Sequence, residues 1–374
     1  MTSSADMNAP TSLQLLGIGS ANDRALKRNL VDALSQMALD IPIEEVRDID
    51  SLLEYGISGI PALLVNGQVV FQKVVPSVED IRIVLNVLLQ KNPPAANPIQ
   101  RIVVPTDFSD AADHAFRYAC EMAALLQADI QLVHVHQPVV DMGGVTLVKR
   151  DPELIHDKMD RLEEMLANRT QLSRSARKVR VAAEVKVGFV VEELQRLSAE
   201  RADMIVMGMT GGSNLIDKWL GTTATEMSRK SNCPVLLIPE HATFRIPHDI
   251  VYASAYLPGE EKLLPRILSF VNQFDATLHF VHIEAVKNTS SYSVQQIPVS
   301  LPHLDHEVRM QFSTVNSRDV LTGLHRYSAD HQSDILVMGS PRRNPVKELF
   351  HRSTTRKMIL QAASPLLIMH FDKD

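Results

Sequence analysis

Hydrophobic and polar positions alternate in blocks along residues 99–240, in the manner of strands joined by helices. Apolar runs of strand length alternate with segments in which apolar residues recur at helical spacing. The pattern predicts strands at 101–106, 129–135, near 179–187, at 203–207 and at 234–238, and helices at 110–126, about 152–172, 190–200 and around 218–230. Five strands joined by crossovers predict a largely parallel, doubly wound α/β sheet.

The same pattern recurs over residues 247–374, so this part of the chain is interpreted as a second copy. Strands are expected at 249–254, 276–282, 334–339 and 365–369. The copies are 148 residues apart between His134 and His282 but 131 apart between Gly208 and Gly339, so the second copy has lost 17 residues. The loss falls at the charged helix, where the segment from Asn288 is rich in poor helix formers. A shortened or missing crossover helix is therefore expected.

Residues 12–89 show a different order: strand, helix, strand, short helix, strand, hairpin strand, helix. Asn66-Gly67 supplies the two-residue hairpin turn. A linker with three prolines follows at 90–98, because proline interrupts both helix and sheet hydrogen bonding. The expected domains are therefore 1–92, 99–240 and 247–374.

Composition narrows the class of protein without naming it. Of 374 residues, 45% are hydrophobic and 22% charged, which is typical of globular domains. The chain has neither an apolar run long enough for a membrane span nor the pattern of a signal peptide, and its two cysteines fit a reducing compartment. We expect a cytoplasmic protein with no membrane partner. A net charge of -6 with scattered basic residues argues against nucleic acid as a partner.

The strongest chemical signal is a glycine-rich loop. It reads Gly208-Met-Thr-Gly211, then nine residues, then Gly221-Thr222, between a predicted buried strand and a predicted helix. Glycines allow a ligand to approach the backbone, and a helix amino terminus attracts phosphate. The alternative is that these glycines only end a strand and begin a helix.

A second loop, Pro105-Thr-Asp107, follows the first strand of the same copy. The carboxyl ends of such strands flank the crevice where ligands bind in doubly wound sheets. The Asp107 carboxylate is suited to ribose hydroxyls or the adenine amino group.

This combination of loop spacing and context resembles the ATP-binding signature of the universal stress protein family. The resemblance implies ATP as the ligand, with or without Mg²⁺, and assigns no catalytic residue. It implies an adenosine side lined by Pro105, Thr106 and Asp107, with Val135 behind the adenine and Met207 and Gly208 beside the ribose. Phosphates would be held by Gly211, Gly221, Thr222 and Thr223. It also implies that the two copies pair through their last strands as an intramolecular pseudo-dimer.

The second copy departs from this signature. It reads Gly339-Ser-Pro-Arg342 and Arg352-Ser353, so two glycines have become arginine, and Ala255 matches Asp107. We expect no ATP binding of the family type there. Arg342, Arg343 and Arg352 are interpreted as surface arginines, with forked binding of a phosphate or carboxylate as the alternative.

The stretch 55–67 resembles the segment of thioredoxin-like proteins that contains a cis proline, here Pro61. Redox members carry C-x-x-C at the first helix, where this chain has Ser20-Ala-Asn-Asp23. Residues 1–99 contain no cysteine, so dithiol exchange is excluded for this domain. An adaptor, a dimerisation module and a purely stabilising role remain open.

Other chemistry finds little support. His134 and His136 lie on one strand face, but a histidine satisfied at the strand end is favoured over a metal ligand. The P-loop lysine, G-x-S-x-G and H-E-x-x-H signatures are absent from the sequence.

The favoured function is an ATP-binding regulatory protein acting on a protein partner that the sequence does not identify. The alternatives are a slow ATPase or self-phosphorylating enzyme with Thr222 or Thr223 as acceptor, and a scaffold without nucleotide. Homodimerisation of the whole chain stays open.

Overall fold

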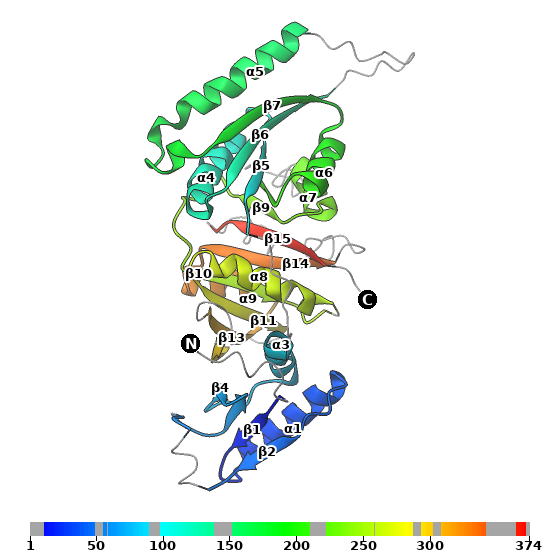
Figure 1. The fold of residues 1–374 in the computed structure, drawn as a ribbon, viewed down its shortest axis with the longest axis vertical. Coiled ribbons are helices and arrows are strands. Elements are labelled where there is room, and N and C mark those ends of the chain that lie inside the picture. The colour runs from blue at the N-terminus through cyan, green and yellow to red at the C-terminus, as the bar shows by residue number, and fades with distance from the viewer. Residues whose placement is uncertain are drawn as a thin grey trace, which may run out of the picture.

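The described residues form two sheets, of four and eleven strands, which follow one another along the long axis of the molecule (Figure 1). The computed structural model describes residues 11–48, 55–57, 59–89, 98–137, 152–209, 222–257, 259–286, 293–301, 308–341 and 364–371. None of the helices in these ranges is long and apolar enough to cross a membrane. The α/β class expected from the sequence is confirmed.

The amino-terminal domain contains the small sheet, in the order β2-β1-β3-β4. Its elements are β1 Leu13–Leu16, α1 Ala21–Gln36, β2 Ile43–Val46, β3 Ala62–Val65, β4 Gln68–Gln72 and α3 Val78–Leu89. The predicted hairpin turn is present, with φ of 52° at Asn66 and 77° at Gly67, as this turn type requires. The Ile60–Pro61 bond is cis, as predicted. The short helix was predicted between β2 and β3, where residues 49–54 and 58 lie outside the described residues.

The first repeat forms five parallel strands in the order β7-β6-β5-β8-β9. Its elements are β5 Arg101–Pro105, α4 Asp110–Leu126, β6 Asp129–His136, α5 Pro152–Ala167, β7 Val181–Val187, α6 Val190–Glu200, β8 Met204–Gly208, α7 Thr222–Lys230 and β9 Val235–Ile238. Helix α5 ends earlier than predicted, and a 3-10 turn at Asn168–Gln171 follows it. The predicted doubly wound sheet is confirmed.

The second repeat has six strands, in the order β12-β13-β11-β10-β14-β15. Its elements are β10 Asp249–Ser254, α8 Leu264–Asn272, β11 Thr277–Ala285, β12 Ser293–Leu301, β13 Val308–Ser317, α9 Val320–Asp330, β14 Ile335–Pro341 and β15 Leu366–Phe371. The residues described between β11 and β13 form β12, which pairs antiparallel with β13. An edge strand thus occupies the sequence position of the lost helix, a feature that the sequence did not predict.

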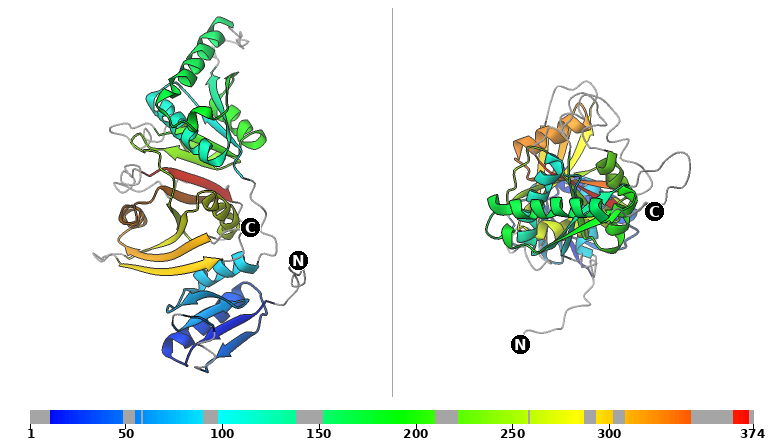
Figure 2. Two further views of the ribbon diagram at one scale, coloured as in Figure 1. Left: turned by 60° about the vertical axis from the view of Figure 1, so that its left-hand side comes forward. Right: turned by 90° about the horizontal axis from the view of Figure 1, so that it is seen from above.

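The two repeats share one sheet because their last strands pair antiparallel. Leu237 on β9 lies opposite Leu366 on β15, and Val235 lies opposite Ile368. This is the intramolecular pairing that the family resemblance implied. One face of the eleven-stranded sheet packs against α4 and α8, and the other against α6, α7 and α9 (Figures 1 and 2).

The amino-terminal domain packs on the second repeat, at the surface that corresponds to the one beneath α5 in the first repeat. The rings of Phe71 and Phe312 lie 6.4 Å apart, and the Tyr256 hydroxyl donates to Asp80 Oδ1 at 2.9 Å. In the first repeat, α5 covers the matching surface, and the Met165 sulfur lies 3.6 Å from Thr106 Oγ1. The amino-terminal domain therefore covers apolar sheet surface that α5 covers in the first copy.

Candidate functional site

The candidate site lies at the switch point of the first repeat, between β5 and β8. These neighbouring parallel strands pair in register, with Ile102 opposite Met204 and Val103 opposite Ile205. Their carboxyl ends therefore lie side by side. The loop that begins at Thr106 and the loop that begins after Gly208 flank the place where doubly wound sheets bind ligands.

The β5 loop is held by its own hydrogen bonds. The Thr106 amide donates to Val133 O at 2.8 Å, and Thr106 Oγ1 accepts from the Phe108 amide at 2.9 Å. Asp107 Oδ1 accepts from the Ser109 amide at 3.0 Å, which forms an Asx turn ahead of α4. The Asp107 side chain is exposed. A carboxylate is thus fixed just after the end of β5 while open to solvent.

Gly208 has a packing reason to be glycine, independent of any ligand. A Cβ built on it would lie 2.2 Å from the Ala111 carbonyl oxygen in the first turn of α4. The alternative interpretation of this glycine, as a structural residue, therefore has direct support. The loop 210–221, with Gly211 and Gly221, lies outside the described residues, and α7 begins immediately after it at Thr222.

The other predicted site residues lie around this switch point on separate elements. Val135 near the end of β6 and Met207 on β8 are buried in the cluster beneath α6 and α7. Pro105 ends β5, half-buried, and Thr223 is half-buried in the first turn of α7. The fold brings Pro105, Thr106, Asp107 and Gly208 to adjacent strand ends, with Val135 on the far side of β5.

Sequence reasoning missed two residues that support the β5 loop. The Arg161 guanidinium of α5 lies 4.0 Å from the centre of the Phe108 ring, and Phe108 lies 4.5 Å from the His134 ring. Phe108 has φ of 66°, unusual for a bulky residue. The internal repeat could have revealed Phe108, because Tyr256 follows it by 148 residues. The same spacing separates His134 from His282, so an aromatic residue recurs at the equivalent place in both copies.

His134 is satisfied at its strand end, as expected. Its Nδ1 lies 2.9 Å from Thr106 O, and burial lowers the pKa of its ring. Within the described ranges there is no group of three or more candidate metal ligands. His134 therefore supports the loop that carries Asp107.

The second repeat builds the same loop without its carboxylate. His282 Nδ1 lies 3.1 Å from Ser254 O, the Tyr256 ring lies 4.3 Å from the His282 ring, and Tyr256 has φ of 52°. Ala255 stands where the first copy has Asp107. Buried Glu260 instead accepts hydrogen bonds from the Ala255 and Leu257 amides at 3.3 and 2.7 Å.

The two copies also differ at the strand that leads into the glycine loop. Strand β8 ends at Gly208, whereas β14 continues past Gly339 and pairs Ser340 with His370 and Pro341 with Phe371. Residues that would begin the loop are thus part of the sheet in the second copy. Arg342, Arg343, Arg352 and Ser353 lie outside the described residues.

Ser20 and Asp23, which stand where redox thioredoxins carry their two cysteines, form a helix cap. Ser20 Oγ accepts from the Asp23 amide at 3.2 Å, and Asp23 Oδ2 accepts from the Ser20 amide at 2.6 Å, which makes a capping box at α1. The chain's two thiols lie elsewhere and are buried, and burial raises the pKa of Cys120 to about 12 and that of Cys233 to about 11. Neither is poised as a thiolate nucleophile.

Known families match two parts of the chain. The universal stress protein family matches residues 98–239, and a thioredoxin domain matches residues 12–86. A thioredoxin of Methanothermobacter thermautotrophicus is 31% identical over 74 residues, 20% of this chain and 96% of the relative. A universal stress protein of Mycobacterium tuberculosis is 24% identical over 261 residues, 66% of this chain and 82% of the relative.

A solved structure extends the likeness in fold over both repeats. The crystal structure of a universal stress protein from Archaeoglobus fulgidus covers 74% of this chain and 99% of its own chain, with a TM-score of 0.53 at 14% identity. The α/β repeats are thus of the universal stress protein fold class. Residues 98–239 thus form a universal stress protein domain, and residues 12–86 form a thioredoxin domain.

Proposed function

We propose that the chain is a cytoplasmic regulatory protein that binds one ATP, with or without Mg²⁺, at the switch point of the first repeat. Residues 1–92, 99–240 and 247–374 act as its three domains. Nucleotide binding stabilises one arrangement of the paired repeats, which a protein partner recognises.

The observation that carries this proposal is the exposed Asp107 carboxylate, fixed at the end of β5 beside the end of β8. In parallel sheets of this topology, ligands bind at such a point. The loop after β8 leads into the amino terminus of α7, whose unpaired N–H groups favour phosphate. Asp107 is suited to the sugar and base, and the α7 end to the phosphates.

The second repeat acts as the structural mate of the first and does not bind ATP. Support comes from Ala255, which removes the carboxylate, and from the extension of β14 through Pro341. Two arginines replace glycines of the signature in the sequence of the second copy. The one-site stoichiometry of the proposal rests on this asymmetry.

The matched substitution Asp107→Ala gives the first repeat the residue that the second repeat already has. We expect it to weaken ATP binding by about tenfold or more, because hydrogen bonds to a charged group contribute roughly 1.5–3 kcal/mol. Asp330→Ala, at an exposed position on helix α9 of the second repeat, is the control and should bind ATP as the native chain does. Equal affinity in the two variants would refute the role of Asp107.

The same preparations distinguish the alternatives. Release of phosphate from ATP, or label transferred from ATP to Thr222 or Thr223, would show an enzyme where we propose a binding protein. Absence of bound nucleotide after purification, together with no ATP binding in solution, would leave a scaffold. We expect one bound ATP without turnover.

A further inference from the structure

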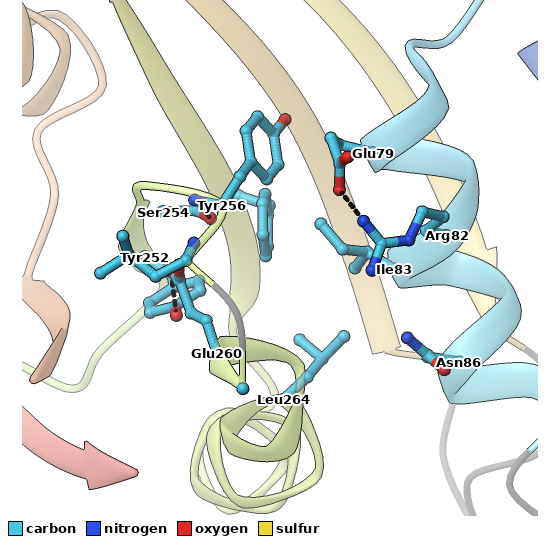
Figure 3. A pocket seen from close by; sticks show the side chains of 12 residues that line it. Glu79, Arg82, Ile83, Asn86, Tyr252, Ser254, Tyr256, Glu260 and Leu264 are labelled. Atoms are coloured by element: carbon cyan, nitrogen blue, oxygen red, sulfur yellow. Dashed lines mark hydrogen bonds and ion pairs between the residues drawn. The ribbon is translucent and has the colours of Figure 1, made fainter. Parts of the chain in front are cut away.

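A cavity of about 190 Å³ lies between the amino-terminal domain and the second repeat. One wall is the face of α3 that carries Arg82 and Asn86, and Tyr256 lies on the opposite wall (Figure 3). Phe280 also lines the cavity. We propose that this cavity binds a small, uncharged aromatic molecule that carries a hydrogen-bond acceptor, such as an amide carbonyl.

The volume sets the size of the ligand. A protein cavity of about 150 Å³ is large enough to bind benzene, whereas pockets for drug-sized ligands span roughly 300–1,000 Å³. A cavity of about 190 Å³ therefore suits one ring with a short substituent. The site is built from α3 and the second repeat, so it is distinct from the ATP site proposed for the first repeat.

The cavity walls favour a flat ring. The Tyr256 and Phe280 rings are close to parallel, at 26°, with centres 6.1 Å apart. The Tyr256 ring is fixed at its hydroxyl by Asp80 of α3. Ile83 and Leu264 add apolar surface from α3 and α8. Aromatic ligands gain from offset or edge contacts with such rings, beyond the area that they bury.

The α3 wall carries hydrogen-bond donors, which favour a ligand with an acceptor. Arg82 lines the cavity with a guanidinium group that only donates, and its Nη1 donates to Glu79 Oε2 at 2.7 Å. An acceptor on the ligand matches such a donor, and a hydrogen bond to a charged group contributes roughly 1.5–3 kcal/mol. Asn86 lies one helical turn further along the same face of α3 and offers an amide as a second donor.

The charges argue against an anion. Glu79 already pairs with Arg82, and the Glu260 carboxylate also lines the cavity, 7% exposed. Glu260 is committed to the Tyr252 hydroxyl and to the backbone of its own loop. Two carboxylates around one arginine leave no excess positive charge for an acidic ligand, so the acceptor should be neutral.

Both domains supply walls, so a bound ligand favours their docked arrangement. A ligand that binds one arrangement and not the other shifts the equilibrium toward it. In the first repeat α5 lies over Phe108, whereas in the second repeat α3 of the amino-terminal domain stands opposite Tyr256. The cavity would thus make domain docking responsive to a small molecule.

The test is a titration of benzamide into the full-length chain with ¹³C-labelled isoleucine and leucine methyl groups. We expect saturable shifts at Ile83 and Leu264, and a dissociation constant for Asn86→Leu raised roughly threefold to tenfold, as the loss of one hydrogen bond predicts. Asn22→Leu, exposed on α1, is the matched control and should leave the affinity unchanged.

A second variant, Ile83→Phe, fills the cavity and should abolish the shifts at Leu264 while the melting temperature reports that the chain is folded. Benzoate should bind more weakly than benzamide. The proposal is overturned if benzamide causes no saturable shift up to its solubility limit, as for a cavity holding only water. The proposal would also be overturned if both Asn86→Leu and Ile83→Phe bound benzamide as tightly as the native chain. Tighter binding of benzoate than of benzamide would overturn it as well.

Discussion

At the scale of single residues, the glycine signature combines residues of two kinds. Gly208 is required by packing, because its Cα faces the Ala111 carbonyl oxygen across the start of α4. Asp107 carries no such packing constraint and is exposed. A substitution at Gly208 therefore tests the stability of the fold, whereas a substitution at Asp107 tests the affinity for ATP. The sequence motif alone does not separate these roles.

Gly208→Ala should destabilise the first repeat by about 1–3 kcal/mol or more, since the new Cβ would meet a backbone atom that belongs to a helix. Calorimetric melting of the purified variant measures the loss. Gly188→Ala is the matched control, because there the Cβ would meet only the flexible Glu193 side chain, at 3.0 Å. Equal melting temperatures for the two variants would contradict the packing role of Gly208.

His134 makes the first repeat sensitive to acid. Burial lowers the pKa of the His134 ring in the folded state, so the fold favours the neutral ring. The stability that the neutral ring contributes is fully present above the pKa of an unfolded histidine, about 6.5. As pH falls below that value toward the folded pKa, this stability is lost. We expect His134→Gln to lose less melting temperature between pH 7.5 and pH 5.5 than the native chain. An identical loss would contradict the assignment.

At the scale of elements, the sequence predicted the bounds of helices α4 and α6 and missed the edge strand β12. Helix α4 has the predicted bounds, because Ser109 caps its amino terminus and its apolar residues recur at helical spacing. Strand β12 was missed because it contains Pro298 and consecutive polar residues. Proline is tolerated at the edge of a sheet, where β12 lies, but the sequence does not reveal which strand lies at an edge.

The pairing of β9 with β15 predicts a specific crosslink. Leu237 and Leu366 lie opposite each other, so Leu237→Cys with Leu366→Cys should form a disulfide within one chain on mild oxidation. Non-reducing electrophoresis should show a monomer, and peptide mass analysis should identify the bridge. Leu237→Cys with Phe371→Cys, which are out of register, is the control. A crosslinked dimer would show that the strands pair between chains.

At the scale of the whole molecule, the amino-terminal domain covers a surface of the second repeat. The corresponding surface of the first repeat is covered by its own helix α5. This could not be predicted from the sequence, because the contacts join residues more than 170 positions apart, such as Asp80 and Tyr256. The sequence did predict the ends of β5 and β8 at the candidate site, since motif and topology agree there. Phe108 and Arg161 were missed because their contact depends on how α5 crosses the sheet.

Tyr256→Phe should loosen the docking of the amino-terminal domain by about 1 kcal/mol, because it removes the hydrogen bond to Asp80. Faster amide exchange in α3, measured by mass spectrometry, is the expected result. Tyr55→Phe is the control, since its hydroxyl contacts Gln14 within the same domain and should leave α3 unchanged. Equal exchange in both variants would show that this bond does not hold the domains together.

The central claim is that a single ATP binds the first repeat while the second serves as its mate. Calorimetric titration of ATP into the full-length chain, after removal of any nucleotide carried through purification, tests it most directly. We predict one site per chain, with the heat strongly reduced in Asp107→Ala and kept in Asp330→Ala. Two sites per chain, or one site that Asp107→Ala leaves intact, would contradict the account.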